Sequence, residues 1–389
     1  MVEYVFDNPK LFVDCVRKAS LLLSSSATES YRRLLHVYDD GTQVWVDAEG
    51  DTGTAHMPIP ATINKTGGFT VIGKEFEKTA RALTDTWATT LTEHDGTITV
   101  KQGRRRLAFP SQEYGSHAAL PEPVTYKPDE TTTLETTRLW AAVNEVAVAR
   151  HTDRSAQGML ATGVFIYTTQ EGEAYAYAVS QGLAHAPGGT TRGAPILFAA
   201  DYNSLTNATK IVDGTVEAWT ENAGRKLCMA QPDGAVFSFH GINATKESIN
   251  QFSLVNIKKI LADDFEETSM RIQVNKRRFV SLAKSAVNLS DSSKTVFIHI
   301  GGEVTVSSKN NGREAFSDTM PCDVVVDNTD GEGVAFTVDQ KSLGLFSGFT
   351  PPEDGNLELA VSPTAKKRFA IVLGDMDSPH YFVVSAGCV

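Results

Sequence analysis

Three short amphipathic helices recur along this chain at a long and nearly constant interval. They are expected to begin near residues 74, 201 and 339, at offsets of roughly 127 and 138 residues. Each belongs to a block that opens with a longer helical pattern and continues with strand-like segments. A period of this length indicates a repeated domain rather than one large core, and 389 residues suit two or three domains.

A longer amphipathic helix is expected near the start of each block. The first covers 8–23, where Asn8 is a candidate N-cap and Pro9 suits the first helical position. Its apolar residues recur at three- and four-residue spacing: Leu11, Phe12, Cys15, Val16, Ala19, Leu22 and Leu23. The second and third long helices are expected over 134–150 and 275–289. The short helices are expected over 74–83, from Asp201 onward, and over 339–346.

Alternating and β-branched segments fill the remainder of each block and predict strands. They cover 44–48, 87–91, 97–100, 106–109, 163–167, 174–179, 215–219, 226–230, 236–240, 272–274, 295–300, 303–307, 356–361, 368–373 and 381–384. The predicted fold class is α+β, with three repeated domains of two helices packed on antiparallel sheets. The predicted domains are 1–125, 126–265 and 266–389, with linkers at 120–128 and 263–267.

The charge of the chain is negative, with 36 Lys and Arg against 47 Asp and Glu and a formal net charge of -11. That balance argues against a protein that coats nucleic acid by bulk attraction, but not against one that gathers positive charge on a single inner surface. Four cysteines are too few and too scattered for a disulfide scaffold or a zinc site. Without a signal peptide or a long apolar run, a soluble intracellular protein is expected.

The motifs of the common enzyme classes are missing from the sequence. It has no G-x-x-x-x-G-K-[ST] phosphate loop, no H-E-x-x-H, no C-x-x-C and no G-x-S-x-G. Asp375, Asp377 and His380 could be imagined as metal ligands, but a turn between two strands explains them better. We therefore expect no catalytic residue, no metal and no cofactor.

Three segments resemble one known family, the bacterial sliding clamp, which is the beta subunit of DNA polymerase III. The segment 71–76 (VIGKEF) is similar to the strand-into-helix start of the family's first domain. The segment 102–107 (QGRRRL) is similar to its Ser-Gly-Arg-Ser-Arg-Phe turn, and 162–164 (TGV) to its Asn-Gly-Val strand start. The three-domain length agrees as well, and a diverged member such as a phage-encoded one fits the resemblance.

The resemblance implies a ring of two head-to-tail subunits, with six domains around double-stranded DNA and helices lining the hole. Heterologous contacts that close give such rings. The lining would contact phosphates without reading sequence. The candidate DNA-binding residues are Lys10, Arg17, Lys18, Lys74, Lys78, Arg81, Arg138, Arg150, Lys210, Lys276, Arg277, Arg278, Lys284 and Lys341. For each of them, an ordinary solvated helix face is the competing interpretation.

The resemblance also implies a pocket for short peptides of the polymerase and the clamp loader, and a contact between subunits. The family's pocket segments fall on 180–185 and 385–389. The candidate pocket residues are Ser180, Gly182, Leu183, His185, Leu254, Val255, Val383 and Ser385, and the candidate dimer residues are Arg104, Arg106, Leu107 and Leu289. Ordinary core or edge positions are the alternative for both sets.

The resemblance implies a processivity factor that tethers the polymerase without bond chemistry, in the cytoplasm at the nucleoid, or in the host cytoplasm for a phage protein. Two other classes compete with it. One is a non-enzymatic, β-rich structural or virion assembly protein that does not bind DNA, and the other is a hydrolase with an unrecognised site. Basic helices in an acidic chain favour the DNA-encircling function over the assembly protein, and the missing turnover motifs argue against the hydrolase.

Overall fold

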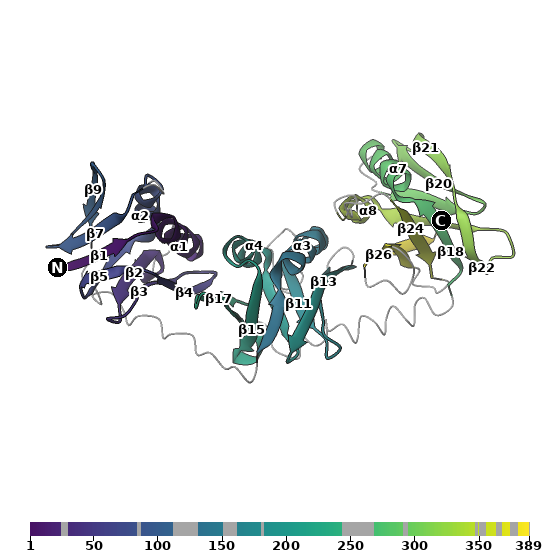
Figure 1. Ribbon diagram of the computed structural model, residues 1–389. Coiled ribbons are helices and arrows are strands. Elements are labelled where there is room, and N and C mark those ends of the chain that lie inside the picture. Colours follow the sequence, from purple (N-terminus) through teal and green to yellow (C-terminus); the bar gives the residue numbers. More distant parts are fainter. Residues whose placement is uncertain are drawn as a thin grey trace. The chain divides into compact units, whose positions relative to one another are not determined.

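The chain forms two compact units, each built from segments that are distant in the sequence (Figure 1). The first contains Met1–Thr137 and Thr191–Gly241, and the second contains Arg138–Thr190 and Ile242–Val389. Strands of the predicted middle domain therefore belong to both units. The computed structural model describes residues 1–24, 30–83, 87–111, 131–150, 162–179, 183–242, 268–290, 295–346, 349, 355–362, 368–373 and 380–388. The two predicted linkers lie outside these residues.

The first unit contains two antiparallel sheets. One has the order β5-β1-β7-β8-β9, with β1 Val2–Phe6, β5 Thr62–Lys65, β7 Thr89–His94, β8 Thr97–Gln102 and β9 Arg105–Pro110. The other runs β6-β2-β3-β4-β17-β16-β15-β10. Its strands are β2 Leu34–Asp39, β3 Val44–Glu49, β4 Gly53–Ile59, β6 Gly68–Ile72, β10 Thr132–Glu135, β15 Thr215–Glu221, β16 Lys226–Ala230 and β17 Val236–His240. The pairing of β4 with β17 joins the first predicted domain to the second.

The second unit repeats this plan. One sheet runs β11-β12-β13-β26-β25-β24-β18-β22, and a second runs β23-β19-β20-β21 with the end of β26 paired to β23. The strands are β11 Gly163–Thr168, β12 Glu173–Val179, β13 Leu183–Gly193, β18 Met270–Asn275, β19 Thr295–Ile300, β20 Glu303–Asn310, β21 Arg313–Pro321, β22 Asp323–Asp327, β23 Val334–Asp339, β24 Asn356–Val361, β25 Arg368–Leu373 and β26 Tyr381–Cys388. Here the pairing of β13 with β26 joins the second predicted domain to the third.

Six α-helices lie in the described part of the chain. They are α1 Pro9–Leu22, α2 Gly73–Ala80, α3 Thr136–Val146, α4 Tyr202–Ile211, α7 Lys276–Leu289 and α8 Gln340–Phe346. Short 3-10 helices cover Ser30–Arg33, Ala147–Ala149 and Asn222–Gly224, and β14 covers Leu197–Asp201 just before α4. In the first unit α1 contacts α2 and α4 and lies against β3 and β4. In the second unit α7 contacts α8 and lies against β20 and β21 (Figure 1).

The predicted starts of α1, α4, α7 and α8 are confirmed by side-chain caps, whereas α2 has no such cap. The Asn8 side chain accepts a hydrogen bond from Leu11 N at 3.4 Å, and Asp201 from Asn203 N at 2.8 Å. Asn275 accepts from Arg278 N at 3.0 Å and Asp339 from Ser342 N at 3.1 Å. Each of these side chains takes up one of the N–H groups that have no partner within the helix.

The long helices α1 and α7 have equivalent surroundings. Each has 14 residues, follows an asparagine cap and comes after the strand that lies next to the edge strand of a sheet, β1 or β18. The fourth residue of each, Phe12 or Phe279, is fully buried, and its ring lies 5.9–6.0 Å from a phenylalanine of the short helix, Phe76 or Phe346. The two helices can therefore be compared position by position.

Three expectations about elements differ from the structure. The helix expected over 134–150 begins at Thr136, because 132–135 form β10 and pair with β15. Leu11, placed on the apolar stripe of the first helix, is 45% exposed. The strand expected from Trp87 begins at Thr89, and strands β1, β4, β5, β13, β14, β21, β22 and β23 were not predicted.

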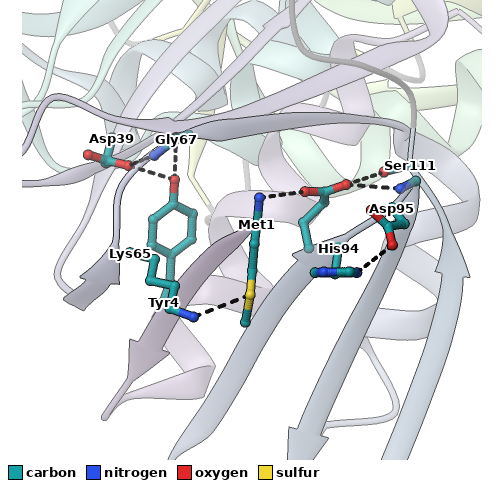
Figure 2. Close-up of polar contacts among 10 residues, drawn as sticks. Met1, Tyr4, Asp39, Lys65, Gly67, His94, Asp95 and Ser111 are labelled. Atoms are coloured by element: carbon teal, nitrogen blue, oxygen red, sulfur yellow. Dashed lines mark hydrogen bonds and ion pairs between the residues drawn. The ribbon is translucent and has the colours of Figure 1, made fainter.

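The first strand is fixed at its end by polar contacts (Figure 2). The Tyr4 hydroxyl donates to Asp39 Oδ2 at 2.9 Å and to the Gly67 carbonyl at 2.5 Å, and the Met1 amino group lies 3.9 Å from Glu93 Oε2. Since Tyr4 is fully buried, these contacts satisfy its hydroxyl where water does not reach. The first residues are thus an ordered part of the sheet.

Candidate nucleic-acid interface and subunit edges

Positive charge is concentrated on the helices. The six α-helices contain twelve Lys and Arg but only four acidic residues, Asp14, Glu75, Glu77 and Glu145, so their formal charge is +8. The whole chain has a net charge of -11, so the remaining residues carry -19. The helix α7 has four cations and no acidic residue. The helices are therefore the part of this protein with the sign of charge that attracts phosphate.

Most of the fourteen candidate DNA-binding residues reach solvent. Exposed are Lys10, Lys78, Arg81, Arg138, Lys210, Arg277, Arg278, Lys284 and Lys341, and half-buried are Arg17, Lys18, Lys74 and Arg150. Lys276 is the exception, since it is 7% exposed at the first position of α7. At that position the side chain packs toward the domain rather than into solvent. We therefore remove Lys276 from the candidate surface.

Some of the exposed cations are partly neutralised by neighbours. Asp14 pairs with Arg17 at 2.7 Å and with Lys18 at 3.4 Å, one helical turn away. Arg81 pairs with Glu77 at 2.5 Å, and Arg278 lies 3.6 Å from Asp318. Among the described residues, no ion pair is formed by Lys10, Lys78, Lys210, Arg277, Lys284 or Lys341. These six side chains are the freest to attract a phosphate.

The predicted peptide pocket falls on the pairing of β13 with β26. Leu183 pairs with Val383 and His185 with Tyr381, so residues almost 200 positions apart become neighbours. Leu183 is half-buried, whereas Val383 and His185 are buried. Ser385 is paired with Arg368 in the backbone of β26. The other candidates, Ser180, Gly182, Leu254 and Val255, lie outside the described residues.

His185 lies within a row of aromatic rings that crosses four strands. Its ring stacks on Tyr381 at 4.8 Å and on Tyr175 at 5.0 Å, and its Nε2 is 2.8 Å from the Tyr167 hydroxyl. Burial raises the pKa of Tyr167 and Tyr381, so both hydroxyls remain protonated. The residue therefore joins the two predicted domains, and its 1% exposure leaves little of it for direct contact with a peptide.

A shallow groove of about 360 Å³ lies beside α3, β12 and β13. Its lining includes Arg138, Glu173 and the hydrogen bond between His380 Nε2 and Glu145 Oε1 at 2.7 Å. From the sequence, His380 could be imagined as a metal ligand. In the structure its ring contacts the carboxylate of Glu145 instead. Within the described residues, no group of three His, Cys, Asp or Glu side chains could hold a metal ion.

The two joints between predicted domains follow one rule. In the first, the opening residues of β17 pair antiparallel with those of β4, from Val236 opposite His56 to Phe239 opposite Gly53. In the second, the opening residues of β26 pair antiparallel with those of β13, from Tyr381 opposite His185 to Val383 opposite Leu183. At each joint, the last strand of one predicted domain, β17 or β26, pairs with a strand of the preceding predicted domain, β4 or β13. Both β4 and β13 are the third strand of a meander, β2-β3-β4 or β11-β12-β13.

The equivalent strands of the third possible joint are both edges. In the first domain, β9 holds the place of β17 and pairs only with β8 among the described strands. In the third domain, β21 holds the place of β4 and pairs only with β20 among them. Both are largely exposed, with Arg104 and Arg106 beside one edge and Glu314 and Asp318 on the other. The charges of the two edges are therefore complementary.

The candidate dimer residues lie at these edges. Leu107 is a half-buried residue of β9, and Leu289 ends α7 with 48% of its surface exposed. Leu22, which ends the equivalent helix α1, is only 2% exposed and lies beside the turn before β4. The sequence pointed to Leu107 and Leu289 but missed β21, because the segment REAFSDTMP lacks a clear alternation of apolar and polar residues.

No protein-family model matches the sequence, and no curated protein does. Solved structures, by contrast, match along the whole chain. The DNA polymerase sliding clamp from Bacillus subtilis gives a TM-score of 0.79 at 13% identity, covering 100% of this chain and 99% of that one. The DNA polymerase III beta chain from Streptococcus pneumoniae TIGR4 gives 0.77 at 15% identity, and the beta subunit from Thermotoga maritima gives 0.75 at 14%, each covering 100% of both chains.

These matches establish the fold. The chain has the α+β architecture of the beta subunits, which confirms the predicted fold class, although most side chains differ from those of these structures. In the part of the chain that the structure describes, none of the helices combines the length and hydropathy needed to span a bilayer.

Proposed function

We propose that this protein is a DNA sliding clamp, a non-enzymatic factor that closes around double-stranded DNA and tethers a replicative polymerase. The observation that carries the proposal is the pair of unmatched edges, β9 and β21. Both strands hold places that are paired in the two joints within the chain, so a third joint of the same kind needs a second copy.

Two copies are enough to close the assembly. Each chain offers one β9 edge and one β21 edge, so two chains placed head to tail form two such joints. Heterologous contacts whose rotation closes produce rings, and three predicted domains per chain give a ring of six. In this arrangement Arg104 and Arg106 would face the acidic side chains Glu314 and Asp318. The apolar contact would come from Leu107 and Leu289.

The distribution of charge supports DNA as the partner. Cations on the helices would be drawn to phosphate, while the negative remainder of the chain repels it. Contacts with phosphates alone carry no sequence information and are weakened by salt, so such a ring would slide. Within this surface we place the exposed candidates, with Lys10, Lys78, Lys210, Arg277, Lys284 and Lys341 contributing most because no ion pair with the described residues neutralises them.

The polymerase and the clamp loader would dock by short peptides near the joint of β13 and β26. The sequence resemblance places the pocket there, and Leu183 is the candidate in the described part that keeps some exposure. A tether of this kind acts by raising the local concentration of the polymerase at the primer end.

The test is topological. The protein is loaded on nicked circular DNA by a clamp loader, the DNA is linearised with a restriction enzyme, and retention is followed by gel filtration. A ring remains on the circle and slides off the linear DNA. Equal rates of loss from circular and linear DNA would overturn the proposal. They would favour a structural assembly protein that does not bind DNA, because such a protein would not discriminate between the two forms.

A charge-reversal variant tests the lining. Arg17→Glu, Arg81→Glu and Lys284→Glu together should weaken retention and flatten its salt dependence, with thermal stability little changed. The matched control reverses three exposed cations of strands and turns, Lys101, Arg192 and Arg225. Equal retention by the helix variant and the parent would remove the helices from the DNA surface.

A further inference from the structure

Two hairpins of the first unit are built alike around one glutamine. At the end of β8, Gln102 Nε2 donates to the Trp87 carbonyl at 3.1 Å, and just after β16, Gln231 Nε2 donates to the Asp213 carbonyl at 3.1 Å. Trp87 and Asp213 each stand two residues before a strand, β7 or β15. Trp87 and Asp213 therefore occupy equivalent positions before their strands, although the turn after β8 (Gly103 and Arg104) is shorter than the turn after β16.

The turn of the second hairpin packs against the first domain. A Cβ on Gly234 would lie 3.5 Å from Pro58 Cγ on β4. On α1, burial and then the carboxylates of Asp14 and Asp233 raise the pKa of Cys15 to about 12, with Lys18 acting in the opposite direction. The turn thus packs against Pro58 of β4, and the Asp233 carboxylate is near enough to α1 to act on Cys15 electrostatically.

The equivalent place in the third domain is an open hollow. Counted from the caps Asn8 and Asn275, Leu282 stands on α7 where Cys15 stands on α1. A hollow of about 330 Å³ lies there between α7 and β21, lined by Asn275, Arg277, Arg278, Ser281, Leu282 and Asp318. At the first joint, the β16–β17 turn packs at the corresponding place.

We infer that, in the ring proposed above, Trp87 and the adjoining β8–β9 turn of one subunit fill this hollow on the partner. At 66% exposure, Trp87 is the most exposed of the large apolar side chains in the described part of the chain. It lies beside the turn, since a Cβ on Gly103 would be 4.0 Å from its ring. The inference rests on the proposed ring and adds an aromatic anchor to it. At the joint within the chain, the equivalent residue is Asp213, which supplies no such anchor.

The hollow offers what an indole can use. Its one apolar lining residue is Leu282, which is 4% exposed, and the guanidinium of Arg277 makes no ion pair with the described residues, so it can lie over the ring face. The Asp318 carboxylate can accept the indole N–H and also offsets the charge that Arg104 brings to the contact. Buried tryptophans of this kind are frequent energetic centres of interfaces.

The test is the dimer dissociation constant of the full chain, measured by sedimentation at several concentrations. Trp87→Ala should raise the constant at least about 30-fold, the size expected for a central anchor. The matched control is Leu11→Ala, which removes another exposed apolar side chain, 45% exposed on α1, and should leave the constant unchanged. Circular dichroism melting of both variants as monomers, at concentrations below the dissociation constant, should match the parent, because neither side chain is buried in the single chain.

A double-mutant cycle locates the contact. Once Trp87 is alanine, Arg277→Ala and Asp318→Asn should cost much less affinity than they do in the parent, whereas independent sites would give additive losses. Additive losses, or a Trp87→Ala protein that dimerises like the parent, would overturn the inference. Either result leaves the clamp standing provided that Leu107→Asp still separates the subunits. A parent that stays monomeric and leaves circular and linear DNA equally fast would instead refute the clamp itself.

Discussion

The strands β17 and β9 hold equivalent positions in two predicted domains. β17 is paired with β4 at a joint within the chain, whereas β9 has an open edge among the described strands. In β17, Phe237 and Phe239 are fully buried, and Ser238 Oγ lies 2.6 Å from Thr54 Oγ1 of the neighbouring domain. In β9, the corresponding opening residues are Arg105, Arg106 and Leu107, which are exposed or half-buried. The joint within the chain is therefore part of a permanent core, while the edge has the composition of a contact made between separate molecules.

The same contrast separates the ends of the two long helices. Leu22 is 2% exposed and Leu289 is 48% exposed, although each is the last residue of a 14-residue helix. A single exposed leucine lowers the stability of a folded protein very little. Beside an unpaired strand, however, exposed apolar side chains indicate a surface that binds another protein. The difference predicts where the assembly opens: at the joints between subunits rather than at those within a chain.

The largest effect is expected from charges placed in the open edges. Leu107→Asp and Leu289→Asp should each convert the dimer to monomer at micromolar concentration in sedimentation velocity, because an unpaired carboxylate would be buried at the centre of the contact. Mixing the two variants tests the head-to-tail arrangement. The mixed pair contains one joint with both leucines intact, so dimers should reappear, and a mixture that stays monomeric would contradict a heterologous contact.

A smaller effect, on folding rather than assembly, is expected at the joint within the chain. Phe239→Ala should lower the free energy of unfolding by about 3–5 kcal/mol, because it leaves a cavity in a fully buried site. Leu107→Ala, at the equivalent open edge, should cost less than about 1 kcal/mol. Urea denaturation of both proteins as monomers makes the measurement, and similar losses would mean that the two strands are not as different as their burial indicates.

The comparison extends to single cations on α1 and α7. Arg17 and Lys284 stand at the same position of their helices, but Arg17 pairs with Asp14 at 2.7 Å while Lys284 has no ion pair among the described residues. Lys284→Ala should therefore weaken DNA retention more than Arg17→Ala and lower the slope of log affinity against log salt by up to about 1. Asp14→Asn should strengthen retention, and a fall in retention would show that the pair organises the surface instead.

The smallest effect concerns acid stability of the sheet that contains the first joint. Burial lowers the pKa of His36, on β2, below its ordinary value, with Asp47 acting in the opposite direction. The unfolded chain then binds the proton more readily, so stability is full above pH 6.5 and declines as the pH falls toward the lowered pKa, by at most about 1.4 kcal/mol per pH unit. His36→Asn should flatten this slope in pH-dependent denaturation, and a slope equal to that of the parent would contradict the role of His36.

Strand pairing was the part of the fold hardest to predict from the sequence. The segment LAHAPGGTTRG of β13 is rich in Gly and Ala and has no β-branched residue before Thr190, so its composition does not indicate a strand. It becomes one because β12 and β26 pair with its two sides. The pocket candidates on β13 and β26 came from the sequence resemblance, and only the pairing shows that Leu183 and Val383 are neighbours.

The amino-acid sequence by itself determined where α1, α4, α7 and α8 begin and most of the face that each of them buries. These properties depend on residues three or four positions apart, such as Asn275 accepting from the N–H of Arg278, or Phe279, Leu282 and Ala286 forming one stripe. The tertiary structure alone decided that Lys276 is buried, that β17 is paired and that β9 is an edge. Such outcomes depend on partners more than a hundred residues away, and local chemistry does not specify which strand will arrive beside another.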